Sequence, residues 1–154
     1  MKPAAIALSA LLCAATAPAS AQMINASDPD SIVAALQRAG FAARIETDSV
    51  GDPMIRSAAR GANFSIFFYG CRGNRDCQDI NFSAGFTMRE PRTLKQMNDW
   101  NRAKLVGKVN IDDEGHPYIR HFVAGVIDMS PAAFDRLLSR WDVAFGEFLD
   151  HIDW

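Results

Sequence analysis

The chain has 154 residues, of which 49% are hydrophobic and 22% are charged, and its formal net charge is −2. This length is enough for one domain with a hydrophobic core of its own. The slightly acidic balance, without a tract of clustered Lys and Arg, excludes electrostatic binding to the phosphates of a nucleic acid.

The first residues, 1–21, have the three parts of a secretory signal peptide. Lys2 supplies the positive start, residues 4–17 form an apolar run, and small residues at 19–21 form a cleavage site. We expect cleavage before Gln22, which would leave a periplasmic or secreted protein. The apolar run is shorter than the ~20 residues of a membrane-spanning helix, and no second run reaches that length. We therefore expect no membrane span.

The chain after this segment begins with a helix and two strands. The helix opens at Asp28-Pro29, where an acidic N-cap precedes a proline in the first turn, and it ends at Gly40. Apolar residues recur at helical spacing between these points. Strands are expected over 41–47 and 54–60, because turn-forming residues separate the two runs.

The clearest β pattern is a strict alternation over residues 63–69 and 80–87. One set of positions is apolar and predicts the buried face of a hairpin: Phe64, Ile66, Phe68, Ile80, Phe82, Ala84 and Phe86. The other set is more polar: Asn63, Ser65, Phe67, Tyr69, Asn81, Ser83, Gly85 and Thr87. Phe67 and Tyr69 are the two aromatic exceptions on this second face.

Cys71 and Cys77 lie between these two strands. In an oxidising compartment an isolated pair predicts a disulfide, and closing so short a loop is worth about 2 kcal/mol. The alternative is a redox-active dithiol in an envelope thiol-disulfide protein. Such thiols usually belong to a Cys-x-x-Cys motif at a helix N-terminus, and neither feature is present. The structural bridge is favoured.

The last part of the chain predicts a short helix capped by Thr93, strands over 105–111 and 116–125, and a long helix that begins at Ser130. The long helix has an apolar stripe: Phe134, Leu137, Leu138, Trp141, Phe145, Phe148, Leu149 and Ile152. Gly146 lies within it and is expected to allow a close approach or a slight bend.

The predicted order of elements is therefore α-β-β-β-β-α-β-β-α. Short connections between strands demand antiparallel pairing, and the apolar stripes of the helices must be buried against the sheet. We expect one α+β domain over 22–154, an antiparallel sheet with its helices packed mainly on one face.

Catalysis needs a nucleophile, an acid–base pair or a metal, and no common motif for these appears. His116 and His121 occupy even and odd positions of one predicted strand, so they point to opposite faces and cannot share a metal ion. His151 follows Glu147 by four residues on the last helix, which predicts an exposed ion pair. We expect no catalytic residue, no metal and no cofactor.

The candidate binding surface is the polar face of the sheet. It is predicted to show Phe67 and Tyr69 in a polar frame: Asn63, Ser65, Asn81, Ser83, Thr87, Val106 and Lys108. Exposed aromatic side chains in such a frame are typical of a contact with a protein or peptide partner. A homodimer interface and coverage by the first helix are the alternatives that the sequence leaves open.

Asn98, Trp100 and Asn101 form a second polar and aromatic group, on the short helix. Asn98 and Asn101 share one side of that helix, so both amides can reach one strand edge or a ligand. The simpler interpretation is that the amides tie the helix to the sheet while Trp100 packs in the core.

The strings at residues 64–71, 77–82 and 98–101, together with the turns at 51–53 and 113–115, resemble the YbjN family. The resemblance covers essentially all of the chain after residue 21. It implies a fold similar to the small α+β chaperones of type III secretion, a role described as bacterial sensory-transduction regulation, and no catalytic residues. Many relatives are cytoplasmic, so this chain would belong to an exported branch. We expect a periplasmic, non-enzymatic binding or regulatory domain, chaperone-like in fold.

Overall fold

The computed structural model describes residues 22–154, and the predicted signal peptide lies outside the described residues. Three helices and six strands follow one another in the predicted order. They are α1 (Pro29–Arg38), β1 (Ala42–Thr47), β2 (Pro53–Ala59), β3 (Ala62–Tyr69), β4 (Asp79–Gly85), α2 (Leu94–Ala103), β5 (Lys108–Ile111), β6 (Pro117–Val123) and α3 (Pro131–His151).

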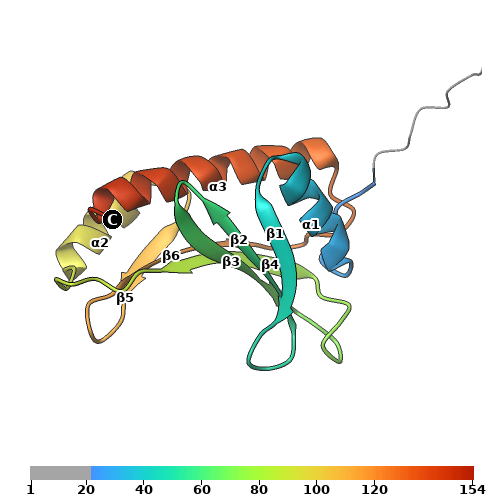
Figure 1. Ribbon diagram of the computed structural model, residues 1–154, viewed down its shortest axis with the longest axis horizontal. Coiled ribbons are helices and arrows are strands. Elements are labelled where there is room, and N and C mark those ends of the chain that lie inside the picture. The colour runs from blue at the N-terminus through green and yellow to red at the C-terminus, as the bar shows by residue number, and fades with distance from the viewer. Residues whose placement is uncertain (1–21) are drawn as a thin grey trace, which may run out of the picture.

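All six strands form one antiparallel sheet in the order β1-β2-β3-β4-β6-β5 (Figure 1). The first four strands are joined as successive hairpins. The chain then leaves the sheet through α2, returns at the far edge with β5, and turns back so that β6 fills the place beside β4. The predicted α+β class and element order are confirmed.

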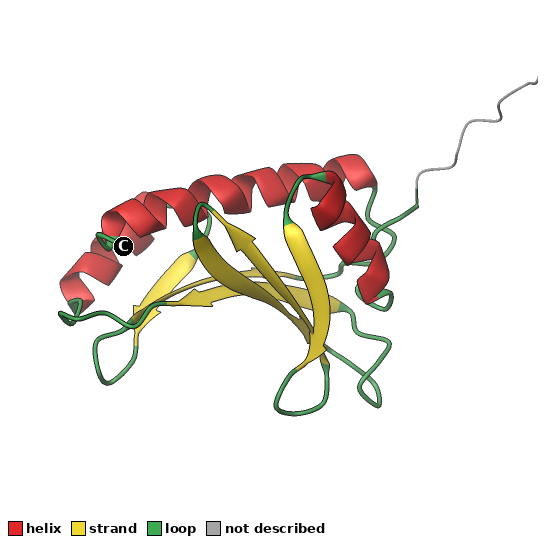
Figure 2. Cartoon of the chain, in the orientation of Figure 1, coloured by secondary structure: helices red, strands yellow, loops and turns green. Residues whose placement is uncertain are grey.

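The helices lie on one side of the sheet. Helix α3 runs the length of the sheet, with α1 at the β1 end and α2 at the β5 end, whereas the β1–β2, β3–β4 and β5–β6 loops project away from α3 (Figures 1 and 2). Within the described residues, the other face of the sheet carries no helix. The prediction that the helices cover mainly one face is confirmed.

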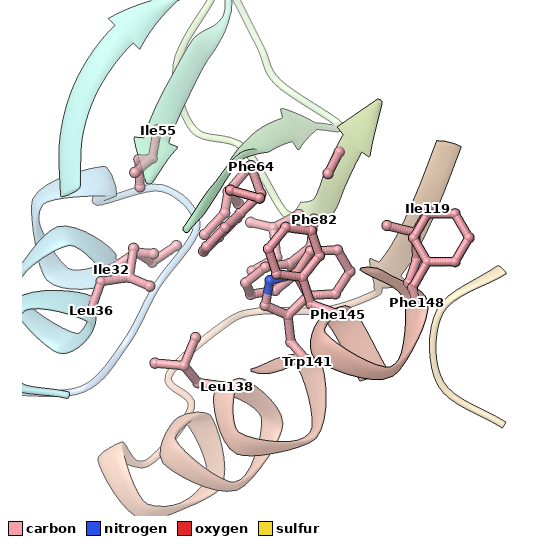
Figure 3. Close-up of a cluster of buried hydrophobic side chains, with 14 of the residues drawn as sticks. Ile32, Leu36, Ile55, Phe64, Phe82, Ile119, Leu138, Trp141, Phe145 and Phe148 are labelled. Carbon is pink, nitrogen blue, oxygen red and sulfur yellow. The ribbon is translucent and has the colours of Figure 1, made fainter. Parts of the chain in front are cut away.

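The core lies between α3 and the sheet. Trp141 stacks on Phe145 with ring centroids 5.3 Å apart, and it also contacts Phe64 and Phe82 of the central strands (Figure 3). These four side chains are nearly or fully buried, and the other buried members of the predicted α3 stripe continue the same layer. The alternation seen in the sequence therefore places the predicted residues in the core.

Helix ends mostly follow the predicted capping chemistry. Thr93 Oγ1 accepts a hydrogen bond from the Gln96 backbone amide, and Gln96 Oε1 accepts one from the Thr93 backbone amide, which completes a capping box. Asp28 is the N-cap of α1, but its side chain makes no capping bond. The buried Ser31 hydroxyl bonds the Asp28 carbonyl instead.

Strand boundaries differ from the prediction by one to three residues, and two of these differences change the predicted polar face. β5 begins at Lys108, so Val106 is not a strand residue, because Gly107 has a φ of 78° and this left-handed conformation interrupts an extended strand. β4 ends at Gly85, so Thr87 also lies outside the sheet. Neither Val106 nor Thr87 belongs to the predicted polar face.

The predicted close approach at Gly146 is confirmed, and the group that approaches the glycine is the side chain of Arg60. A Cβ atom there would lie 2.7–2.9 Å from the Arg60 Cδ, Nε and Cζ atoms. Arg60 passes over the glycine and forms a two-point ion pair with Asp142, with nitrogen–oxygen distances of 3.1 and 2.6 Å. The absence of a side chain at Gly146 therefore lets the β2–β3 turn lie against α3.

The segment before α1 is part of the core, which the sequence does not predict. Ile24 and Ala26 are fully buried. The Ile24 amide donates to the Met129 carbonyl and the Met129 amide to the Ile24 carbonyl, at 2.8 and 2.9 Å, while the Ala26 amide donates to Val126. Residues 24–26 therefore fasten the start of the domain to the segment that precedes α3.

Candidate binding face

The side of the sheet opposite the helices is called the open face here. Residues directly opposite each other in antiparallel strands share a face, so the register identifies its members. Met54, Phe67, Asn81 and Phe122 form one row across β2, β3, β4 and β6. The sheet thereby brings into one row residues that are 68 positions apart in the chain, Met54 and Phe122.

Two aromatic side chains are in contact on this face, and a third lies on the same strand as one of them. Tyr69 and Phe122 are 45% and 55% exposed, and their rings lie edge to face with centroids 6.1 Å apart. Phe67 is half-buried on the same face, two residues before Tyr69 on β3 and separated from Phe122 by Asn81 in the row. Scattered exposed apolar residues are common on soluble proteins, but a contiguous group with a polar rim is typical of a contact surface.

Polar groups of the same face surround the rings. Ser65 and Ser83 lie opposite each other, and the Ser65 hydroxyl accepts a hydrogen bond of 3.1 Å from Arg56 Nη1. Asn81 lies between Phe67 and Phe122, and its side-chain oxygen is buried without a hydrogen-bond partner among the described residues.

The structure brings together only part of the predicted site. Phe67, Tyr69, Asn81 and Ser83 share the open face, as do Asn63, Ser65 and Lys108 of the predicted frame. The group on α2 lies elsewhere, at the β5 edge and on the helical side of the sheet.

Asn101 on α2 takes the place of a neighbouring strand at the edge of the sheet. Its Nδ2 donates to the Val109 carbonyl at 2.9 Å, and its Oδ1 accepts from the Val109 amide at 3.0 Å. Trp100 is 3% exposed, packs on Phe148, and donates from Nε1 to the Gly107 carbonyl at 2.7 Å. Asn98 is exposed and takes no part in these contacts.

We expect Asn101→Ala to lower the free energy of unfolding by about 2 kcal/mol, because both backbone groups of Val109 lose their partner. Urea denaturation measures the loss, and faster hydrogen exchange at the Val109 amide locates it. Asn98→Ala is the matched control and should change the stability by less than about 0.5 kcal/mol. Equal effects of the two substitutions would contradict the edge role of Asn101.

The disulfide between Cys71 and Cys77 is present and closes the β3–β4 loop. Cys77 is 2% exposed and packs in the core, and a thiolate without access cannot act as a nucleophile, which favours a structural role. The polar tip of the loop contacts the neighbouring hairpin, because Asn74 Nδ2 donates to the Val50 carbonyl and to Asp52 Oδ1.

The histidines are dispersed. The predicted ion pair between His151 and Glu147 is wrong, because Glu147 pairs with Lys104 at 2.9 Å and the His151 ring contacts the Gln96 carbonyl. Burial lowers the pKa of His121, because it disfavours the charged form of the ring. Among residues 22–154, no cluster of three or more His, Cys, Asp or Glu side chains is placed to share a metal ion.

Phe122 is the main residue of the open face that the sequence analysis missed, together with Tyr118 and Arg120. The signal was present, since these three residues alternate with the apolar Ile119 and Val123 in a predicted strand. What was missing was the strand order, because only the position of β6 beside β4 brings Phe122 next to Asn81.

Fold and site together define a small α+β domain in which, among the described residues, one face of the sheet is covered by helices and the other carries none. The chain belongs to the YbjN family, described as "Putative bacterial sensory transduction regulator", whose model matches residues 28–154. No curated protein matches the chain at a significant level. None of the helices among the described residues is long and apolar enough to cross a membrane.

Proposed function

We propose that the protein is a periplasmic, non-enzymatic binding or regulatory domain that contacts a protein or peptide partner through its open face. A chaperone-like role, in which this face holds another polypeptide, is one form of the same function. The description of the YbjN family as a regulator, rather than as an enzyme, supports the general class.

The observation that carries the proposal is the contact between Tyr69 and Phe122 on a face without helices. Both rings remain about half exposed, although each already has an aromatic neighbour, and Phe67 extends the group toward the centre of the sheet. Burying such rings against a partner removes apolar surface from water and stabilises a complex.

Two features support the exported location. Residues 1–21 have the pattern of a signal peptide, and the Cys71–Cys77 bridge is the kind of bond that persists in an oxidising compartment. The bridge holds the end of β3, where Tyr69 lies two residues before Cys71, so it also positions part of the aromatic group.

The test is affinity capture from the native envelope extract with the wild type and with Tyr69→Ser/Phe122→Ser. We expect the double variant to capture less partner than the wild type by a factor of about ten or more, because two exposed aromatic contacts are lost. Val143→Ser is the matched control, since Val143 is also 55% exposed but lies on α3. It should capture as much partner as the wild type.

The outcomes separate the alternatives. Equal capture by the double variant and the wild type would reject the open face as the binding surface. Capture of a second copy of the chain, lost in the double variant, would identify the surface as a homodimer interface. Thermal unfolding of each variant shows whether the substitutions leave the fold intact, as expected for exposed positions.

A further inference from the structure

A second row of the open face, next to the aromatic one, carries the basic residues. The register aligns one residue from each of the six strands: Arg44, Arg56, Ser65, Ser83, Arg120 and Lys108. Four cations and two hydroxyl groups thus follow a single line across the whole sheet. We call this line the basic row.

The cations stand in two pairs, one at each end of the basic row. Arg44 and Arg56 line a shallow hollow of about 590 Å³ at the β1–β2 end. Arg120 and Lys108 line another, of about 540 Å³, at the β6–β5 end. The two serines lie between the pairs.

The two pairs differ in how far they are neutralised. Arg44 Nε and Arg56 Nε both form ion pairs with the carboxylate of Glu46, at nitrogen–oxygen distances of 2.6 and 3.1 Å. The hydrogen bond from Arg44, and then that from Arg56, lowers the pKa of Glu46. Arg120 and Lys108 are exposed, and neither forms an ion pair within the described part of the chain. Each end of the basic row therefore keeps a net positive charge, because the carboxylates on the same strands do not neutralise it fully.

This concentration of positive charge runs against the composition of the protein. The whole chain has 18 acidic and 16 basic residues, yet the strand residues of the open face include four cations and only two carboxylates, Glu46 and Asp79. Of the acids in the loops at the strand ends, Asp48 and Asp112 accept hydrogen bonds from their own turn amides and Asp52 accepts one from Asn74. Asp76, Asp113 and Glu114 are exposed beyond the ends of the strands, away from the basic row. Charge complementarity therefore points to an acidic partner.

We propose that the basic row recognises an extended acidic segment of a partner polypeptide that lies across the strands. This inference rests on the proposed function and specifies the chemistry of the partner. Strands are ~4.8 Å apart, so Arg56 and Arg120 are separated by about 14 Å, which an extended chain covers in about four residues. Carboxylates at that spacing can reach both ends, while an apolar side chain between them contacts Phe67 and Phe122.

A polypeptide fits the face better than another polyanion does. The adjacent aromatic rings favour apolar side chains, which a polypeptide carries beside its carboxylates. Four cations, two of them sharing Glu46, are few for the continuous phosphates of a nucleic acid.

The experiment measures binding of a random copolymer of glutamate and tyrosine to the purified protein, by fluorescence anisotropy at low and at physiological salt. We expect binding that weakens with salt, and about tenfold weaker binding for Arg120→Glu and for Lys108→Glu. Arg136→Glu makes the same charge change on the exposed side of α3 and should bind like the wild type. A lysine–tyrosine copolymer should not bind.

Equal binding by wild type, Arg120→Glu and Lys108→Glu would overturn the inference. So would equally tight binding of heparin, single-stranded DNA or phosphatidylglycerol vesicles, which would show general attraction to anions. If the copolymer fails to bind while capture still depends on Tyr69 and Phe122, the acidic partner is rejected and the proposed function stands. If that dependence is absent as well, both are rejected.

Discussion

Trp141→Ala should lower the free energy of unfolding by about 4 kcal/mol, the largest effect expected from a single substitution in this domain. Trp141 is fully buried between α3 and the central strands, where it contacts Phe64, Phe82 and Phe145. Truncation removes its transfer free energy and leaves a cavity that these three rings cannot fill without moving. Urea denaturation monitored by far-ultraviolet circular dichroism measures the loss.

Trp141→Phe separates the contribution of the ring from that of its polar atom. The indole Nε1 is buried and makes no hydrogen bond with the described residues, so phenylalanine keeps an aromatic ring while it removes an unpaired donor. We expect a loss of about 1 kcal/mol. Val143→Ala, at an exposed site two residues away, should change the stability by less than about 0.5 kcal/mol. A loss for Trp141→Phe as large as for Trp141→Ala would contradict this assignment.

Ile24→Ala should lower the free energy of unfolding by about 3 kcal/mol, although Ile24 precedes the first helix and the segment matched by the family. The side chain is fully buried, and both of its backbone groups bond to Met129. Urea denaturation tests the loss, and hydrogen exchange at the Met129 amide, which donates to the Ile24 carbonyl, should become faster.

Met23→Ala is the control for Ile24, because Met23 is the neighbouring residue and is 43% exposed. It should change the stability by less than about 0.5 kcal/mol. A loss below about 1 kcal/mol for Ile24→Ala would mean that this segment is not fastened to the domain in solution. Cleavage before Gln22, as the sequence predicts, would leave this segment intact.

The sequence predicted the elements and their faces where the residue pattern is regular. The period of two over residues 63–69 and 80–87 places alternate side chains on opposite faces in any strand, so Phe67 and Tyr69 were assigned to the face opposite Phe64. The stripe on α3 was equally clear, because Trp141 and Phe145 recur at the helical period. Such local patterns do not depend on which element lies next to which.

The candidate site was predicted only in part, because it depends on the pairing between distant segments. Tyr69 could be assigned to a face, but its contact with Phe122 requires β6 to lie beside β4. Asn98 and Asn101 look alike in the sequence, and only the position of the β5 edge makes Asn101 a bonding partner. The basic row is invisible for the same reason, since each strand contributes a single member.

By itself the amino-acid sequence determined the α+β class, the order of helices and strands, the inward side chains and the cysteine pair, because each follows from local periodicity or from short spacing. Only the tertiary structure decided the strand order, the burial of Ile24, the edge contact of Asn101 and the surface shared by the aromatic and basic rows. These features are contacts between residues far apart in the chain, and the free energy of packing the whole domain, rather than any local preference, selects them.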